Sequence, residues 1–276
     1  SGLKLLHGFP FPYIVSLSYS PISRTITLTP SGSDFIIWIK GVKFTKTGAQ
    51  VSPAHANTTG NYFIYYDASG VLQISGTPWQ INSSISPVCY VYYNSSLIDG
   101  IALFELHTAD RSLDWHESQH FLNGTFLRSG LEISGYTLNS DSNTAVTFGL
   151  AAGIIVDEDI EYNVNTLSDN GPYFILNRTG TTDFTWTTAN VLPYRVGTTY
   201  IQYNQNNGGT WQLTELTSTD YVNYYIFATT ALDPAKRIIV VPGQAKFTTL
   251  TLAQGESVSS INWSNILIPE ICAVWK

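Results

Sequence analysis

The stretch that decides the fold class is RTITLTPSGSDFIIWIKGVKF, residues 24–44. Its first six residues alternate Ile26 and Leu28 with threonines, which is the period of two expected of a half-buried β-strand. The apolar run FIIWI at 35–39 comes next, and Gly41 separates it from another short run as a turn residue would. β-Branched and aromatic residues favour such pleated positions, so the stretch predicts consecutive antiparallel strands.

Short β-rich runs separated by turn residues continue on both sides of this stretch. Residues 67–70, DASG, link two such runs as a tight hairpin, and QNNGG at 205–209 marks another hairpin tip. No internal repeat of fixed period is apparent. The sequence therefore predicts an all-β protein, mainly of antiparallel sandwich or barrel-like domains, with one or two short helices.

The helices are expected in two places. Residues 115–122 are the best candidate, with Asp114 as the N-cap and Asn123-Gly124 as the stop, and 253–259 could form a short helical turn. These segments suggest four parts, namely an extended N-terminal arm (1–20), a β-sandwich domain (21–106), a histidine-containing connector with the short helix (107–129) and a second β domain (130–276).

The composition limits the partners. Apolar residues make up 43% of the 276, enough for a core, but charged residues make up only 12% and the net charge is −7. Asn, Ser, Thr, Gln and Gly fill the segments between the apolar runs, a coat common in extracellular and viral structural proteins. The absence of a Lys/Arg run argues against nucleic acid as a partner, and no apolar run is long enough to insert into a membrane.

The cysteines do not form a framework. Cys89 and Cys272 each lie in an apolar β-like run, which predicts two buried free thiols. A single long-range disulfide between them is the alternative.

Several segments resemble a known class of proteins. SRTITLTPSGSDFIIWIKGVKFTKTGAQ (23–50), followed by GNYFIYYDASGVLQ (60–73), resembles bacteriophage virion proteins of the tail-fibre or minor structural class. FELH at 104–107, GLAAGIIVDEDI at 149–160 and the closing segment 247–270 resemble further motifs of that class, and the likeness spans about residues 22–275. Residues 110–112, Asp-Arg-Ser, depart from its usual Met-Asp-Gly-like turn. We attach no activity to these motifs, which are structural signatures.

The resemblance implies a non-enzymatic structural protein of the virion, located in the tail or a tail fibre, that positions a host-contacting or docking surface. Its partners would be other virion proteins and further copies of itself, with a trimer favoured. Two alternatives stay open, a tail protein that binds or degrades host surface polysaccharide, and a capsid decoration or head-fibre protein. No nucleophile triad, phosphate loop or dinucleotide fingerprint stands out.

Three of the five histidines lie within fourteen residues. His116 and His120 are four residues apart, so on a helix they share one face and can share a metal, and His107 at the end of a strand could supply a third ligand. Three imidazoles can hold Zn²⁺, or less selectively another transition metal such as Ni²⁺ or Fe²⁺. The alternative is that these rings only pack and hydrogen-bond to backbone.

The run DEDIE at 157–161 is the densest acidic site. On a continuous strand Asp157, Asp159 and Glu161 would share one face, with about 6–7 Å between neighbours. Such a set could bind Ca²⁺, or could supply the carboxylate pair of a glycoside hydrolase. A solvated strand face is the simpler interpretation.

Some aromatic residues lie near polar turns rather than inside apolar runs. Exposed aromatic faces among Asn, Gln and Asp side chains are a common way of gripping sugars. The candidate glycan-binding residues are Trp79, Trp186, Tyr203 and Trp211. The competing interpretation places most of these rings in the core of a sandwich.

Overall fold

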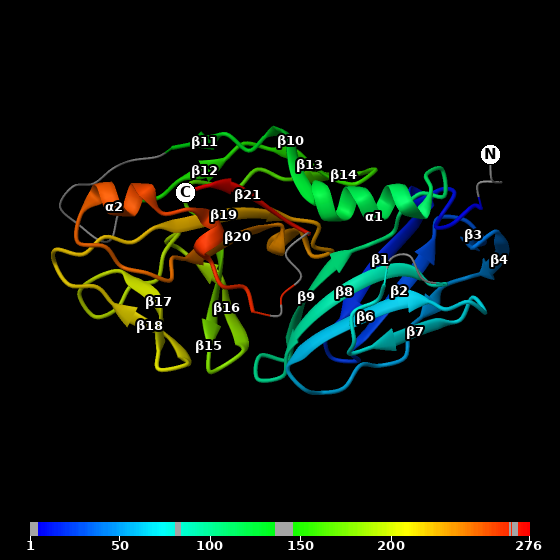
Figure 1. The fold of residues 1–276 in the computed structure, drawn as a ribbon, viewed down its shortest axis with the longest axis horizontal. Coiled ribbons are helices and arrows are strands. Elements are labelled where there is room, and N and C mark those ends of the chain that lie inside the picture. Colours follow the sequence, from blue (N-terminus) through cyan, green and yellow to red (C-terminus); the bar gives the residue numbers. More distant parts are fainter. Residues whose placement is uncertain (1–4, 81–83, 136–145, 265, 267–269) are drawn as a thin grey trace. The chain divides into compact units, whose positions relative to one another are not determined.

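The structure is a computed structural model that describes residues 5–80, 84–135, 146–264, 266 and 270–276. It confirms an all-β protein, whose described residues include two short α-helices (Figure 1). The chain clusters into two compact units, each considered by itself below. Unit 1 comprises Ser1–Thr125, Val156–Glu161 and Thr230–Asp233, and unit 2 comprises the remainder.

Unit 1 is built from antiparallel sheets ordered β1-β2-β5, β3-β4 and β7-β6-β8-β9. Strand β8 is buried along its whole length between β6 and β9. Helix α1 follows β9 in the chain. The elements are the 3-10 turn η1 (Pro12–Ile14), β1 (Val15–Ser20), β2 (Thr25–Pro30), β3 (Asp34–Ile39), β4 (Val42–Thr47), β5 (Gln50–Val51), β6 (Gly60–Tyr66), β7 (Leu72–Ser75), β8 (Ser86–Asn94), β9 (Asp99–Phe104) and α1 (Leu113–Leu122).

The alternation seen in the sequence decides which side chains enter the core of unit 1. Ile26 and Leu28 of β2 are buried while the threonines beside them are not, as the period of two predicts. The β3–β4 turn is formed by Lys40 and Gly41, both in the left-handed region at φ 45° and 81°. Two positive φ angles in a two-residue loop match the right-handed twist of the paired strands, which explains a glycine at this position.

The N-terminal segment is more closely attached to unit 1 than a free arm would be. Gly8 pairs with Trp38 and Phe9 with Thr108, and Phe9 is buried in the core. Strand β1 then pairs along its length with β2. The segment predicted as an extended arm is therefore largely incorporated into the unit's own sheets.

Unit 2 centres on a five-stranded sheet ordered β16-β15-β20-β19-β21, in which β15 and β20 are parallel. Hairpins β11-β12 and β17-β18 accompany it, and the latter turns at Gly208-Gly209, as predicted. The strands are β11 (Ile133–Ser134), β12 (Gly149–Leu150), β15 (Tyr173–Thr179), β16 (Asp183–Asn190), β17 (Gln202–Asn207), β18 (Thr210–Glu215), β19 (Tyr224–Thr229), β20 (Ile238–Pro242) and β21 (Ile271–Trp275), with η2 (Pro234–Lys236), α2 (Leu250–Gly255) and η3 (Val258–Ser260) between the later ones.

A further sheet is ordered β10-β13-β14, from Thr125–Gly130, Gly153–Asp157 and Ile160–Val164. The tip of its β13–β14 hairpin, Val156–Glu161, is the part that clusters with unit 1. This tip carries most of the acidic run.

Both cysteines are buried free thiols, as predicted, and no disulfide joins them. Among the helices in the described part of the chain, none has the length and apolar character needed to cross a membrane.

A buried histidine outside the predicted cluster helps to organise the core of unit 1. The ring of His55 stacks on Tyr62 with 4.2 Å between centroids. Its Nδ1 lies 2.8 Å from the Ala56 carbonyl, which can only accept, so Nε2 accepts from the Tyr19 hydroxyl at 2.8 Å. Burial lowers the pKa of His55 below its usual value, so the neutral ring is the one that fits.

This environment predicts a pH effect on stability. The unfolded chain binds a proton at His55 more readily than the folded chain, so the free energy of unfolding falls as the pH drops below about 6.5. The variant His55→Gln lacks this titration and should lose less stability between pH 7.5 and 5 than the wild type, measured by urea unfolding. Equal losses in both proteins would contradict the assignment.

Candidate functional site

Helix α1 places two of the predicted histidines together. Its N-cap is Ser112, whose hydroxyl accepts from the Trp115 amide, and its C-cap is Asn123. The expected cap, Asp114, instead lies in the first turn, because the extended backbone of Ser112 starts the helix two residues earlier. His116 and His120 are both buried, one turn apart on the same face, as the spacing predicted.

The acidic run does not form the continuous strand that the sequence suggested. The chain reverses at Glu158 and Asp159, between β13 and β14, and Glu158 adopts φ 49°. Asp157 and Glu158 are therefore buried whereas Glu161 is exposed, so the three acids predicted as a Ca²⁺ set do not share a face. A glutamate in the left-handed region costs roughly 1–2 kcal/mol, so contacts of its side chain must offset this strain.

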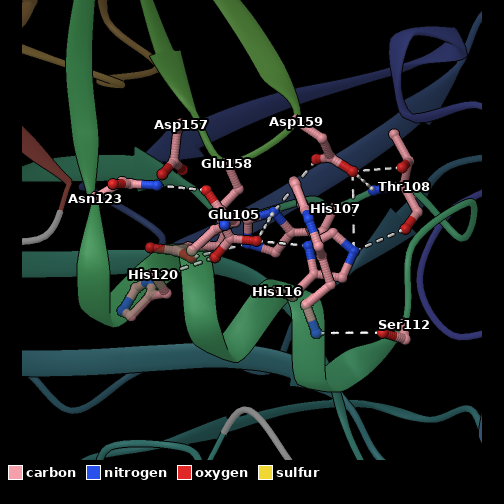
Figure 2. A network of polar contacts seen from close by, with 12 residues as sticks. Glu105, His107, Thr108, Ser112, His116, His120, Asn123, Asp157, Glu158 and Asp159 are labelled. Carbon is pink, nitrogen blue, oxygen red and sulfur yellow. Dashed lines mark hydrogen bonds and ion pairs between the residues drawn. The ribbon is translucent and has the colours of Figure 1, made fainter.

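Those contacts are with the three histidines, which converge on the Glu158 carboxylate (Figure 2). His116 Nδ1 lies 2.5 Å from Oε2, His107 Nδ1 lies 3.3 Å from the same oxygen, and His120 Nδ1 lies 3.4 Å from Oε1. All of these residues belong to unit 1. The sequence thus identified the histidines correctly as a group, but their central partner is Glu158, which the spacing of the acidic run did not single out.

Asp159 lies on the other side of His107 and His116. Its Oδ1 is 3.8 Å from His107 Nδ1, and its Oδ2 is 3.8 Å from His116 Nε2. Thr108 fixes this carboxylate by donating both its amide, at 3.3 Å, and its hydroxyl to Oδ2. The carbonyl of Thr108 in turn accepts from His116 Nε2 at 3.1 Å.

Glu105 is a member of the cluster that sequence reasoning did not identify. It is buried in the segment after β9, and its Oε2 lies 3.6 Å from His107 Nε2. Together with Asp157, Glu158 and Asp159 it brings four carboxylates to the three imidazoles. Its only sequence signal is its place two residues before His107, which puts both side chains on one face of an extended segment.

The cluster favours the charged forms of Glu158, Asp159 and His107. Burial alone would raise the pKa of Glu158, but the histidines, led by His107, outweigh it and lower the pKa to about 2. Burial alone would lower the pKa of His107, but the carboxylates, led by Glu158, raise it well above its usual value. Contacts with His107 and Thr108 likewise outweigh burial and lower the pKa of Asp159. The site is therefore a buried ionic cluster.

A cavity of only about 20 Å³ adjoins this cluster, bordered by His7, Gly8, His107, Leu113 and His116 among others. One water needs roughly 10–15 Å³ measured in this way, so the space suits a single water and no sugar ring. This cavity is therefore too small to serve as the open cleft that glycoside hydrolysis requires.

The predicted glycan-binding aromatics are mostly covered. Trp186, Tyr203 and Trp211 are buried, and Trp211 packs under the Arg178 guanidinium at 4.2 Å. In this conformation these three rings lack the open face that stacking on a sugar requires, because their apolar surface is used in the core. Trp79 is half-buried and packs edge-on against Phe63, with 5.1 Å between centroids.

Unit 2 contains a wider cavity of about 590 Å³ that the sequence did not indicate. Residues from β11, β19, β20 and β21 line it, and most of them are apolar. Tyr194, Tyr224 and Lys276 are its main polar members. The cavity arises from side chains distant in the sequence, so no local motif could have revealed it.

Comparisons with known proteins add no functional assignment. No protein-family model matches the chain, and it matches no curated protein and no solved structure. Its function is therefore inferred from its own residues.

The central place of Glu158 predicts a large effect of neutralising it. In Glu158→Gln the buried histidines lose their shared carboxylate, which should lower the free energy of unfolding by about 3–5 kcal/mol. The matched control is Glu117→Gln, the same change at a partly exposed position of α1, where we expect a change within about 0.5 kcal/mol. Chemical denaturation at neutral pH measures both, and similar effects of the two substitutions would argue against an ionic cluster centred on Glu158.

Proposed function

We propose that this chain is a non-enzymatic structural protein of a bacteriophage virion, a component of the tail or of a tail fibre. The observation that carries the proposal is where the resembling motifs lie. The motif 104–107 supplies Glu105 and His107, and the motif 149–160 supplies the hairpin tip with Glu158. These motifs thus build an internal cluster next to a cavity too small for a substrate. Motifs that form the interior of a domain, rather than an open site, are expected of a structural protein.

The surface supports a role in assembly and attachment. Because charged residues are few, we expect the protein surface to consist mainly of uncharged polar side chains. Such a surface forms hydrogen bonds with water without creating a strong electrostatic field. The described N-terminal part of unit 1 also exposes several large apolar side chains, namely Leu5, Phe11, Tyr13, Ile14 and Ile22. Phe11, Tyr13 and Ile22 each expose 66% or more of their surface, so a partner that covers this segment would gain substantial apolar burial.

The proposed partner for this segment is another copy of the chain, with a trimer favoured by the cyclic symmetry common in such assemblies. Sedimentation at micromolar concentration should then give three times the chain mass of 30.5 kDa. The double variant Phe11→Ser/Tyr13→Ser should shift the protein towards monomer. Val191→Ser, at an equally exposed residue of unit 2, should leave the mass unchanged.

A monomeric wild type at that concentration would contradict the oligomeric part of the proposal. Its location is tested separately by electron microscopy of particles labelled with antibody against the chain. Label on the tail or its fibres is the expected result. Label on the head would favour the decoration or head-fibre alternative, and unlabelled particles would contradict a place in the virion.

The second alternative, a tail protein that acts on host polysaccharide, is tested by incubating the protein with host capsule or lipopolysaccharide. We expect no shortened oligosaccharides, because Asp157 and Glu158 are buried and the side chain of Asp159 is only 11% exposed. Release of oligosaccharides by the wild type but not by Asp157→Asn or Asp159→Asn would overturn the non-enzymatic proposal and identify the acidic run as the site.

A further inference from the structure

We propose that His107, His116 and Asp159 bind one divalent transition-metal ion, with Zn²⁺ as the best fit, inside unit 1. One potential ligand atom from each residue lies within 4.8 Å of those from the other two. Tetrahedral Zn²⁺ with bonds of about 2.0–2.1 Å sets its ligand atoms roughly 3.4 Å apart. The distances of 3.8 Å from each carboxylate oxygen of Asp159 to a histidine nitrogen are close to that spacing. Because these two distances involve different oxygens of the carboxylate, side-chain rotations that bring His116 Nε2 towards Oδ1 would complete the site.

Buried polar atoms that make ion-pair contacts but no hydrogen bond support a ligand at this place. His107 Nδ1 and Asp159 Oδ1 are buried and make no hydrogen bond of normal geometry within the described residues, and the same holds for Glu158 Oε1. Buried polar atoms are nearly always satisfied, so each such atom needs a reason. A cation bound between His107 Nδ1 and Asp159 Oδ1 would satisfy two of these three buried atoms.

The charge of the cluster leads to the same conclusion. Four carboxylates, from Glu105, Asp157, Glu158 and Asp159, meet three imidazoles within unit 1. With neutral rings, the form that binds metals, the cluster carries an excess of buried negative charge. A divalent cation offsets this excess at short range.

Glu158 has a positioning role in this arrangement. His116 presents Nδ1 to Glu158 at 2.5 Å and Nε2 to the side of Asp159, where metal binding would replace the hydrogen bond from Nε2 to the Thr108 carbonyl. A histidine that binds metal through one nitrogen usually donates its other N–H to a carboxylate, which fixes the ring and its tautomer. Thr108 acts in the same way on Asp159, because its two donors hold Oδ2 and leave Oδ1 free to bind.

The donor set and the adjoining space define the ion. Two imidazoles with one carboxylate suit Zn²⁺ and related ions, whereas Ca²⁺ prefers six or more oxygen ligands. The cavity of about 20 Å³ borders both His107 and His116 and has room for a water as fourth ligand. The site differs from the set His107, His116 and His120 expected from spacing, because His120 faces the other oxygen of Glu158.

Such an ion would have a structural role. It would join three separate segments of unit 1, namely the stretch after β9, helix α1 and the β13–β14 hairpin tip. This inference is independent of where the chain lies on a particle. The rival is a metal-free ionic cluster of the same histidines and carboxylates.

The experiment is a titration of chelator-treated, dialysed full-length protein with Zn²⁺ at neutral pH, by calorimetry and by elemental analysis after gel filtration. We expect one ion per chain and a higher unfolding temperature when it is bound. Asp159→Asn and His107→Gln should abolish both effects. Glu158→Gln should weaken binding by about 10–100-fold, the usual cost of losing a carboxylate that orients a ligand.

Two controls separate the site from general histidine binding. His55→Gln removes a buried histidine elsewhere in unit 1 and should bind Zn²⁺ as the wild type does. His120→Gln should still bind one ion, and its failure to do so while folded would favour the three-histidine set and overturn the proposed ligands. Should the Asp159 variant fail to fold, Co²⁺ in the wild type gives an independent measurement. Its visible spectrum should be that of a four-coordinate nitrogen and oxygen site, with ring protons of two histidines shifted by the metal.

Folded wild-type protein that binds no Zn²⁺ at micromolar concentrations would leave the metal-free ionic cluster as the correct description. Binding that persists undiminished in Asp159→Asn would likewise overturn the site.

Discussion

Burying the Glu158 carboxylate is the constraint on which the organisation around the candidate site depends. A carboxylate removed from water costs several kcal/mol unless opposite charge and hydrogen-bond donors surround it. The three histidines provide that environment, and they come from the stretch after β9 and from one face of α1. The hairpin tip, the helix and the end of the strand therefore have to be placed together, and the left-handed backbone of Glu158 is held by the same contacts.

The rest of unit 1 follows from apolar burial. Strands β2 and β3 place alternate side chains in one core with the fully buried strand β8, and short turns such as Lys40-Gly41 keep the pairings antiparallel. His107 links the apolar core to the ionic cluster. It lies shortly after the apolar strand β9, and it is one of the three histidines that contact Glu158. A core of this kind fixes the positions of polar groups accurately, because close-packed side chains leave little freedom.

The cluster also bears on the choice between a structural and a catalytic role. Catalysis needs titratable groups that reach a substrate. Here Glu105, Asp157 and Glu158 are buried, and the cavity beside His107 and His116 has space for about one water. The same burial that argues against chemistry on a polysaccharide makes the set suitable for holding a small cation. A polar, weakly charged surface with an exposed apolar N-terminal segment is consistent with the proposed attachment to further copies of the chain.

Local patterns were sufficient for the fold class. The period of two in β2, the hairpin tips at 67–70 and 205–209, and the shared face of His116 and His120 are properties of neighbouring residues, so the sequence alone predicted them. The acidic run was misread because alternation cannot show where a strand reverses, and a glutamate is an unusual residue for the left-handed turn at 158.

What only the tertiary structure decided is which side chains meet. Glu105 and Glu158 lie 53 positions apart by number, and no spacing rule joins them to one set of histidines. Burial of Trp186, Tyr203 and Trp211 likewise depends on the packing of distant strands, although their neighbouring polar turns suggested exposure. Short-range periodicity is written into consecutive residues, whereas charge compensation and burial arise from contacts that form only when the chain has folded.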